Sequence, residues 1–393
     1  MANPSDSFNP RIWSSFIQST YLTRQPPQPL GTILADEIET KAKEKLKDHP
    51  VLYPMPLVLG PIGTQSLFAE EGELGPAMAG KETGVPFIIS TVASRSMEDV
   101  AEANGSAERW PRTEALTLSL LQRAKDLKYM YRISGDHRQL RRRLACTRHQ
   151  RDHTGSGLKR HVSAFSPHLS GIGCEVGRGD PTFMNKLGLP PDTHNQPPFP
   201  FDYLGLRKKL VDEDEKAVQE AAIGMAWAQE VCSGRYRSWE DLAWLRKQWE
   251  GPLILKGVLR AEDAERAVEN GVDGIVVSNH GGRQIDGEIA TMDALRDIVA
   301  SSVVRAAQAD GAFTVFLDSG VRTGTDVLKA VALGADAVFL GRAYLWASCV
   351  GGKDGVKQFI HQTMAEIDVT LGLLGYTSLD ELRGCKSVLR VHK

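Results

Sequence analysis

The chain has 393 residues, of which 41% are hydrophobic, so it can bury a large core as one large α/β domain or two ordinary ones. Its formal net charge of −2 argues against nucleic acid or an anionic membrane as the main partner. The five cysteines are scattered and show no metal-binding spacing, which predicts a reduced protein without a metal site. The N-terminus does not read as a signal peptide, and no apolar stretch approaches the ~20 residues of a membrane span. We therefore expect a cytoplasmic protein without a membrane partner.

In chain order, residues 1–50 are expected to form an N-terminal helical segment, and residues 51–393 a single domain. The first strands of that domain are predicted at 56–63 (PLVLGPIG) and 86–91 (PFIIST). The stretch between them, EGELGPAMAGKETG, has helical character. This alternation is the beginning of a series of βα units.

The second half of the chain continues the series. Four short runs rich in β-branched residues are apolar throughout, which is typical of parallel strands covered on both faces. They lie at 252–258, 274–279, 313–320 and 336–342. Two of the helices between them are expected to end at glycines, Gly271 and Gly334.

The series favours a (β/α)8 TIM barrel over an open doubly wound sheet, chiefly because polar residues follow almost every strand end. In a barrel these ends converge on one mouth. Such residues follow the later strands: Lys256, Ser278, His280, Asp318, Gly341 and Arg342.

Two chemical tasks are indicated at that mouth. The glycine-rich stretches 318–324 and 340–342 offer backbone N–H groups at helix starts, which suit a phosphate and therefore a phosphorylated cofactor. His280 and Arg283 lie three residues apart on glycine-rich backbone. Histidine accepts a proton near neutral pH and arginine binds a carboxylate through two N–H groups, so the pair suits a substrate with an acidic proton and a carboxylate.

Two stretches carry a family resemblance: SNHGGRQ (278–284) and DSGVRTGTDVLKAVALGADAVFLGR (318–342). They closely resemble the FMN-dependent α-hydroxy acid dehydrogenases, the group that contains glycolate oxidase and lactate 2-monooxygenase. The likeness extends from about residue 171 to 346 and from 56 to 110. The stretch PPDTHNQPPFPFDY is most similar to the fungal lactate 2-monooxygenase branch.

The resemblance implies an FMN-dependent oxidation of a small 2-hydroxy acid to a 2-oxo acid, with O2 as the expected electron acceptor and a homo-oligomeric enzyme. It implies that His280 removes the substrate proton and that Arg283 binds the substrate carboxylate. Lys256 would lie beside the pyrimidine edge of the flavin. The other residues implied to bind the cofactor are Pro61, Ile62, Gly63, Thr91 and Ser278 for the ring, and Asp318, Ser319, Gly320, Val321, Arg322, Gly341 and Arg342 for the phosphate.

The chain departs from the family pattern at three places. Trp110 is followed directly by Pro111, where relatives continue a third strand that carries a flavin-binding glutamine and a substrate-binding tyrosine. A basic insert at 129–170, with nine Lys and Arg against two acids, stands where the fourth strand is expected. A stretch with another active-site tyrosine is missing before residue 51. We therefore expect a barrel that is incomplete around strands 3 and 4, with turnover that is low or absent. We take the insert as a mis-spliced or decayed stretch rather than a nucleic-acid-binding arm.

Three functions remain open from the sequence. The first is the flavin-dependent oxidation, and the second is a catalytically impaired flavin-binding pseudoenzyme. The third is a phosphate-binding barrel isomerase or aldolase that uses Lys256. Taken singly, His280 and Asp318 also suit purely structural hydrogen bonding, and GVRTG alone is a weak motif.

Overall fold

The computed structural model describes residues 56–105, 109–111, 123, 171–231, 239–249, 251–283 and 285–389. The expected N-terminal helical segment (1–50) and the basic insert (129–170) lie outside these residues. The strands are β1 (Leu57–Leu59), β2 (Phe87–Ile89), β3 (Arg109–Pro111), β4 (Ile254–Val258), β5 (Gly274–Val277), β6 (Thr314–Leu317) and β7 (Ala337–Leu340).

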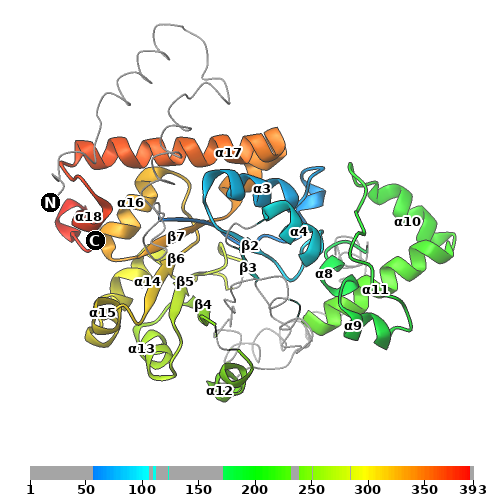
Figure 1. Cartoon of the computed structure of the whole chain (residues 1–393), viewed down its shortest axis with the longest axis horizontal. Helices are drawn as coiled ribbons and strands as arrows, with labels where there is room; N and C mark the ends of the chain where they lie inside the picture. Colours follow the sequence, from blue (N-terminus) through cyan, green and yellow to red (C-terminus); the bar gives the residue numbers. More distant parts are fainter. Residues whose placement is uncertain are drawn as a thin grey trace, which may run out of the picture.

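The strands form one parallel sheet in the order β3-β2-β1-β7-β6-β5-β4. The first strand pairs with the last, Leu57 opposite Val338 and Leu59 opposite Leu340. Pairing of the first strand with the last is what a closed (β/α) barrel requires. Among the described strands none joins β3 to β4, so this part of the chain forms a curled, incomplete barrel wall (Figure 1).

All six strands predicted from the sequence are present, and no bound differs from the expected one by more than four residues. A short third strand is present, because β3 adds to the edge of β2 with Phe87 opposite Arg109. A short strand can form wherever a neighbouring strand has a free edge, and the local sequence does not show whether such an edge is available. In the described part of the chain no strand joins β3 to β4, which confirms an incomplete barrel.

Helices surround the sheet, and α17 runs across one side over α3 and α16 (Figure 1). Gly271 and Gly334 follow α13 and α16 with positive φ, as the sequence predicted. The helices are α3 (Leu74–Thr83), α4 (Met97–Asn104), α8 (Glu175–Arg178), α9 (Pro181–Lys186), α10 (Tyr203–Val211), α11 (Glu215–Val231), α12 (Trp239–Gln248), α13 (Ala261–Glu269), α14 (Thr291–Ile298), α15 (Ser302–Ala309), α16 (Gly324–Leu333), α17 (Arg342–Leu373, kinked at Gly351 and Gly352) and α18 (Leu379–Leu382), with 3-10 turns η3 (Gln65–Leu67) and η5 (Lys386–Val388).

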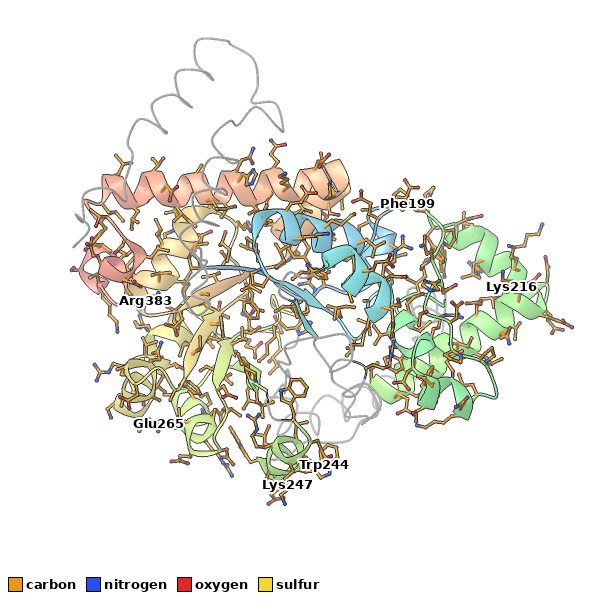
Figure 2. The ribbon with its side chains drawn as sticks, viewed as in Figure 1. Phe199, Lys216, Trp244, Lys247, Glu265 and Arg383 are labelled. Atoms are coloured by element: carbon orange, nitrogen blue, oxygen red, sulfur yellow. The ribbon has the colours of Figure 1, made fainter. Side chains whose placement is uncertain are left out.

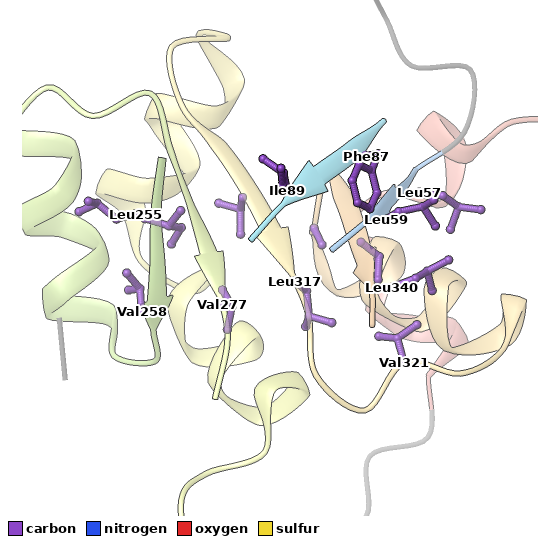
Figure 3. Close-up of a cluster of buried hydrophobic side chains, with 14 of the residues drawn as sticks. Leu57, Leu59, Phe87, Ile89, Leu255, Val258, Val277, Leu317, Val321 and Leu340 are labelled. Carbon is purple, nitrogen blue, oxygen red and sulfur yellow. The ribbon is translucent and has the colours of Figure 1, made fainter. Parts of the chain in front are cut away.

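Strand residues alternate between two buried layers, because successive side chains of a strand point to opposite faces. The outer layer packs between the sheet and the helices, and Figure 3 shows part of it, including Leu59, Ile89 and Leu340. The inner layer fills the concave side of the sheet. It consists of Val58, Ile88, Ile254, Val276, Phe316, Ala337 and Phe339.

Helices α8 to α11 form a lobe beside α4 (Figure 1). In α11, Trp227 is 1% exposed, packs against the backbone of Gly177 and donates its indole N–H to the carbonyl of Thr91 (3.0 Å). This lobe is thereby attached to the end of β2. By contrast, Trp244 and Lys247 lie on the outward face of α12 (Figure 2).

None of the helices that the structure describes is both long and apolar enough to cross a membrane.

Leu317 tests the outer layer, because it is fully buried at the end of β6. We expect Leu317→Ala to lower the free energy of unfolding by about 2–5 kcal/mol, since it removes buried methyl groups and leaves a cavity. Val350→Ala is the control, because Val350 is 91% exposed and its truncation should change stability by less than about 0.5 kcal/mol. Denaturant unfolding measures both, and equal losses would contradict the assignment of this layer as core.

Candidate active site

A polar layer lies directly beyond the apolar inner layer, at the carboxyl ends of the strands. Counting two residues on from an inner-layer side chain gives the next position on the same face. These positions are Gly60, Ser90, Lys256, Ser278, Asp318 and Gly341. Four of the six are residues that the sequence predicted for the site, and they lie on different strand ends of one edge.

Lys256, Ser278 and Asp318 form the centre of this layer. Lys256 Nζ donates to Ser278 Oγ (2.7 Å) and lies 3.0 Å from Asp318 Oδ2. Burial alone raises the pKa of Asp318, but the positive charge of Lys256 and hydrogen bonds from Ser278, Ser319 and Lys256 outweigh it and lower the pKa. Asp318 is therefore a carboxylate at neutral pH, and Lys256 is its cationic partner.

A chain of hydrogen bonds leads from this pair to the His280 turn. Ser319 Oγ donates to Asp318 Oδ1 (2.8 Å) and accepts from the backbone N–H of Gly281 (2.9 Å). The backbone N–H of His280 donates to Ser278 Oγ (3.1 Å). The turn after β5 is thus fixed to the ends of both β5 and β6.

Strained backbone gathers at this edge. Among described residues other than glycine, positive φ occurs at Thr64, Glu213, His280 and Ser319. Three of these four lie in segments that follow β1, β5 and β6, and such conformations persist where the surroundings impose them, often at functional sites. His280 (φ 58°) begins a run of three left-handed residues with Gly281 (68°) and Gly282 (74°).

The two arginines predicted for the site approach the same carbonyl. Arg283 Nη1 (3.4 Å) and Arg342 Nη2 (3.3 Å) both donate to the oxygen of Gly281. Gly281 itself has a φ of 68°, which favours glycine, and a Cβ there would lie 2.7 Å from Arg283 Nη1. Two guanidinium groups are thereby placed side by side at the mouth.

The segments after β6 and β7 can hold a phosphate. Arg342 begins α17, and its N-cap Gly341 has no side-chain cap. The first N–H groups of a helix have no acceptor inside the helix and favour an anion. A Cβ added at Gly320 or Gly341 would meet no atom within 4 Å, so open space borders the backbone of both segments. These residues therefore fit the phosphate of a nucleotide-like cofactor.

The loop after β1 carries Pro61, Ile62 and Gly63, and it lies against the end of β2. Thr64 N donates to Val92 O (2.9 Å), and a Cβ at Gly63 would lie 2.4 Å from the Val92 side chain. Thr91 is buried beside this contact. The predicted ring-binding residues of the two strand ends are thus neighbours.

The sequence reasoning missed Gly60 and Ser90, although counting two residues on from Val58 and Ile88 finds them. It also missed two buried carboxylates, Glu73 and Glu175, whose pKa values burial raises, that of Glu175 to about 8. Glu175 Oε2 accepts from the backbone N–H of Gly173 (2.8 Å). Carboxylates buried in this way have no local sequence signal, because acidic side chains usually face solvent.

Comparison with known proteins accords with this geometry. Residues 49–387 match the family described as FMN-dependent dehydrogenase. The chain belongs to this family. It is an enzyme of the FMN-dependent α-hydroxy acid dehydrogenase class, and its cofactor is FMN.

Individual relatives agree. The chain is 38% identical over 342 residues to the FMN-dependent alpha-hydroxy acid dehydrogenase qulF of Penicillium citrinum, covering 85% of this chain and 74% of the relative. It is 33% identical over 336 residues to an L-lactate oxidase of a Nostoc species, covering 84% and 78%. A solved structure of a mandelate oxidase variant with (S)-mandelic acid has a TM-score of 0.57 and 29% identity, covering 84% and 77%.

In the described part of the chain, no group of three or more His, Cys, Asp or Glu residues is arranged to hold a metal ion.

The Lys256–Asp318 pair gives a pH-dependent prediction. In Lys256→Met the Asp318 carboxylate keeps its burial but loses its cation, so its pKa should rise and the protein should lose about 3 kcal/mol at about pH 7. Protonation of Asp318 removes the unpaired charge, so the difference from the wild type should shrink as the pH falls to about 4. In the wild type Asp318 affects the pH dependence of stability in the opposite direction. Its pKa is lowered in the folded state, so the stability that it contributes is lost as the pH falls through that pKa.

Denaturant unfolding at both pH values measures this effect. Lys329→Met is the matched control, because Lys329 pairs with Asp326 on the surface of α16 and should cost less than about 1 kcal/mol. A Lys256→Met defect that is the same at both pH values would contradict the proposed ionic role.

Proposed function

We propose that this chain oxidises a small 2-hydroxy acid to the 2-oxo acid, with His280 as the proton acceptor and Arg283 as the ligand of the substrate carboxylate. The observation that carries the proposal is the continuous set of contacts from Lys256 through Asp318 and Ser319 to the His280 turn. These contacts support the proposal because they join the segment that carries His280 and Arg283 to the segment after β6 at one edge of the sheet.

FMN, when bound, supplies the two-electron acceptor for the oxidation. Its phosphate would be held by the backbone of residues 318–322 and by Gly341 and Arg342. Its ring would be held by Pro61, Ile62, Gly63, Thr91 and Ser278, with Lys256 placing a positive charge beside it. O2 is the proposed final electron acceptor, and a homo-oligomer is the proposed assembly.

His280 is suited to take a proton because imidazole titrates near neutral pH. Its backbone conformation is held on both sides, by Ser278 Oγ at its own N–H and by Ser319 Oγ at the N–H of Gly281. A base held in a fixed orientation loses little entropy when it meets the substrate proton. The left-handed backbone at 280 therefore serves to orient the ring.

Arg283 offers a planar guanidinium that matches a carboxylate. It is exposed and three residues after His280, so the base and the carboxylate ligand belong to one short turn. A 2-hydroxy acid has its acidic proton on the carbon next to its carboxylate, and this spacing suits that arrangement.

The isomerase or aldolase alternative requires Lys256 as a free amine. Lys256 Nζ is instead engaged by Ser278 Oγ and Asp318 Oδ2. The contacts therefore favour an electrostatic role for Lys256 over a nucleophilic one.

FMN binding tests the cofactor part of the proposal. Apo-protein titrated with FMN should quench the flavin fluorescence, and the bound cofactor should raise the Tm, since a ligand specific for the folded state stabilises it. Arg342→Ala should weaken FMN binding by at least about 10-fold, because it removes a charged phosphate ligand. Arg296→Ala, on the exposed side of α14, is the control and should leave the affinity unchanged. Equal affinities for both variants would refute this phosphate site.

Flavin reduction tests the chemistry. A panel of 2-hydroxy acids that includes glycolate, lactate and mandelate should bleach the flavin absorbance in anaerobic single-turnover mixing, even if turnover is slow. His280→Ala should slow the reduction by at least ~100-fold with FMN still bound, which is the usual scale for a lost general base. Arg283→Lys should mainly weaken substrate binding, because an ammonium cannot donate in a planar pair.

If no hydroxy acid in the panel reduces the bound flavin of the wild type, the oxidase proposal fails and the pseudoenzyme alternative is supported.

A further inference from the structure

A buried polar network lies beneath the strand ends on the side away from the opening in the sheet. We define it by Tyr344, Gln65, Glu73 and Ser94, each of which is fully buried. Its members come from three separate segments: the start of α17, the loop after β1 that leads into α3, and the loop after β2. Each segment also carries residues proposed to bind FMN.

Tyr344 connects the first two segments. It is two residues beyond Arg342, and its hydroxyl donates to the carbonyl of Gly60 (2.7 Å) and accepts from Gln65 Nε2 (3.3 Å). The same amide nitrogen of Gln65 donates to the carbonyl of Ile62 (3.1 Å). Two carbonyls of the loop that carries Pro61–Gly63 thus have side-chain donors, Gly60 O from Tyr344 at the start of α17 and Ile62 O from Gln65.

Glu73 connects the loop after β1 to the loop after β2. Its Oε1 accepts from the backbone N–H groups of Gln65 and Ser94 (both 3.0 Å), and its Oε2 accepts from Ser94 Oγ (2.7 Å). Ser94 Oγ in turn accepts from the backbone N–H of Ser66 (2.8 Å). Each end of the loop 60–66 therefore has a side-chain partner inside the protein.

Such a network stabilises a core less than apolar side chains would. Burying a hydroxyl, an amide and a carboxylate costs free energy that hydrogen bonds only offset, whereas apolar side chains of the same volume would stabilise the fold directly. Burial raises the pKa values of both Glu73 and Tyr344, because the charged form of each group is poorly solvated inside the protein. The network instead fixes the positions of three segments relative to one another, because hydrogen bonds require defined distances and directions and apolar contacts do not.

The open sheet gives this geometry a particular use. In a closed barrel each strand end is held by neighbours on both sides around the whole circle, but among the described strands none joins β3 to β4. The β1–β7 pairing and the buried network are adjacent, since Gly60 N donates to Leu340 O (2.7 Å) and Tyr344 holds Gly60 O. Together they fix the half of the mouth that lies away from the opening.

We propose that Tyr344, Gln65 and Glu73 are positioning residues that hold the ring-binding loop 60–66 at a fixed place relative to the phosphate-binding start of α17. None of them is proposed to touch FMN. With the two segments held in place, the flavin ring and the phosphate bind at the same time without rearrangement of the protein. Binding of one end of the cofactor then strengthens binding of the other end. This proposal rests on the proposed FMN site.

The test compares FMN with riboflavin, which has the same ring and lacks the phosphate. The ratio of the riboflavin Kd to the FMN Kd measures how much the phosphate adds once the ring is bound. Tyr344→Phe removes the hydroxyl that joins the two segments, so this ratio should fall by about 10-fold, measured by quenching of flavin fluorescence. Tyr376→Phe is the matched control, because Tyr376 lies on the turn after α17, and its ratio should equal that of the wild type.

Gln65→Met is a second variant, which keeps the length of the side chain and removes its donors, and it should lower the ratio in the same way. Glu73→Gln keeps a hydrogen-bonding group and should restore most of the ratio that Glu73→Ala loses. Apo-protein unfolding in denaturant is measured for every variant.

A purely structural role predicts lower apo-protein stability with an unchanged ratio in both Tyr344→Phe and Gln65→Met, and that result would overturn the proposal. A different result would show that the proposed FMN site itself is wrong. In that case Arg342→Ala has the same FMN affinity and the same Kd ratio as the wild type, and the proposal loses its basis.

Discussion

The parallel pairing of β1 with β7 joins the first described strand to the last, and the rest of the site depends on it. Because of it, the loop after β1, the start of α17 and the segment after β6 meet at one edge, although they are far apart in the sequence. Gly60 illustrates how close this contact is, since a Cβ there would lie 2.8 Å from the carbonyl of Leu340. An open sheet with the same strands in a different order would separate these segments.

Charge then organises what the backbone brings together. The inner face of the sheet changes from apolar to polar side chains within two residues on β2, β4, β5 and β6, and Lys256 and Asp318 neutralise each other at that boundary. The pair is partly shielded from water, so its attraction is stronger than that of a surface pair. Ser278 and Ser319 extend this pairing to the His280 turn through their hydroxyl groups.

The sequence predicted much of this arrangement. The apolar runs of β4 to β7 and the glycines after α13 and α16 are local signals, and they predicted those elements close to their observed bounds. The contact of Lys256 with Ser278 and Asp318 follows from the convergence of strand ends in a barrel.

The short strand β3 was not predicted, because it depends on the free edge of β2. The Tyr344, Gln65 and Glu73 contacts were not predicted either, because they join side chains from distant segments. Glu73 in particular lies in the acidic stretch EEGE, which reads as a solvated helix start.

The left-handed backbone at His280 restricts which residues evolution or a designer can place there. Asparagine, aspartate and glycine tolerate positive φ, whereas valine, isoleucine and threonine are strongly disfavoured. A library of all residues at position 280, selected for stability, would therefore be enriched in these small polar residues and in glycine. Selected for proton transfer near neutral pH, the same library would be enriched in histidine. Position 280 is thus a place where the folding preference of the backbone and the chemistry of the side chain select different amino acids, and histidine satisfies both only because it is among the few larger side chains that the left-handed region accepts.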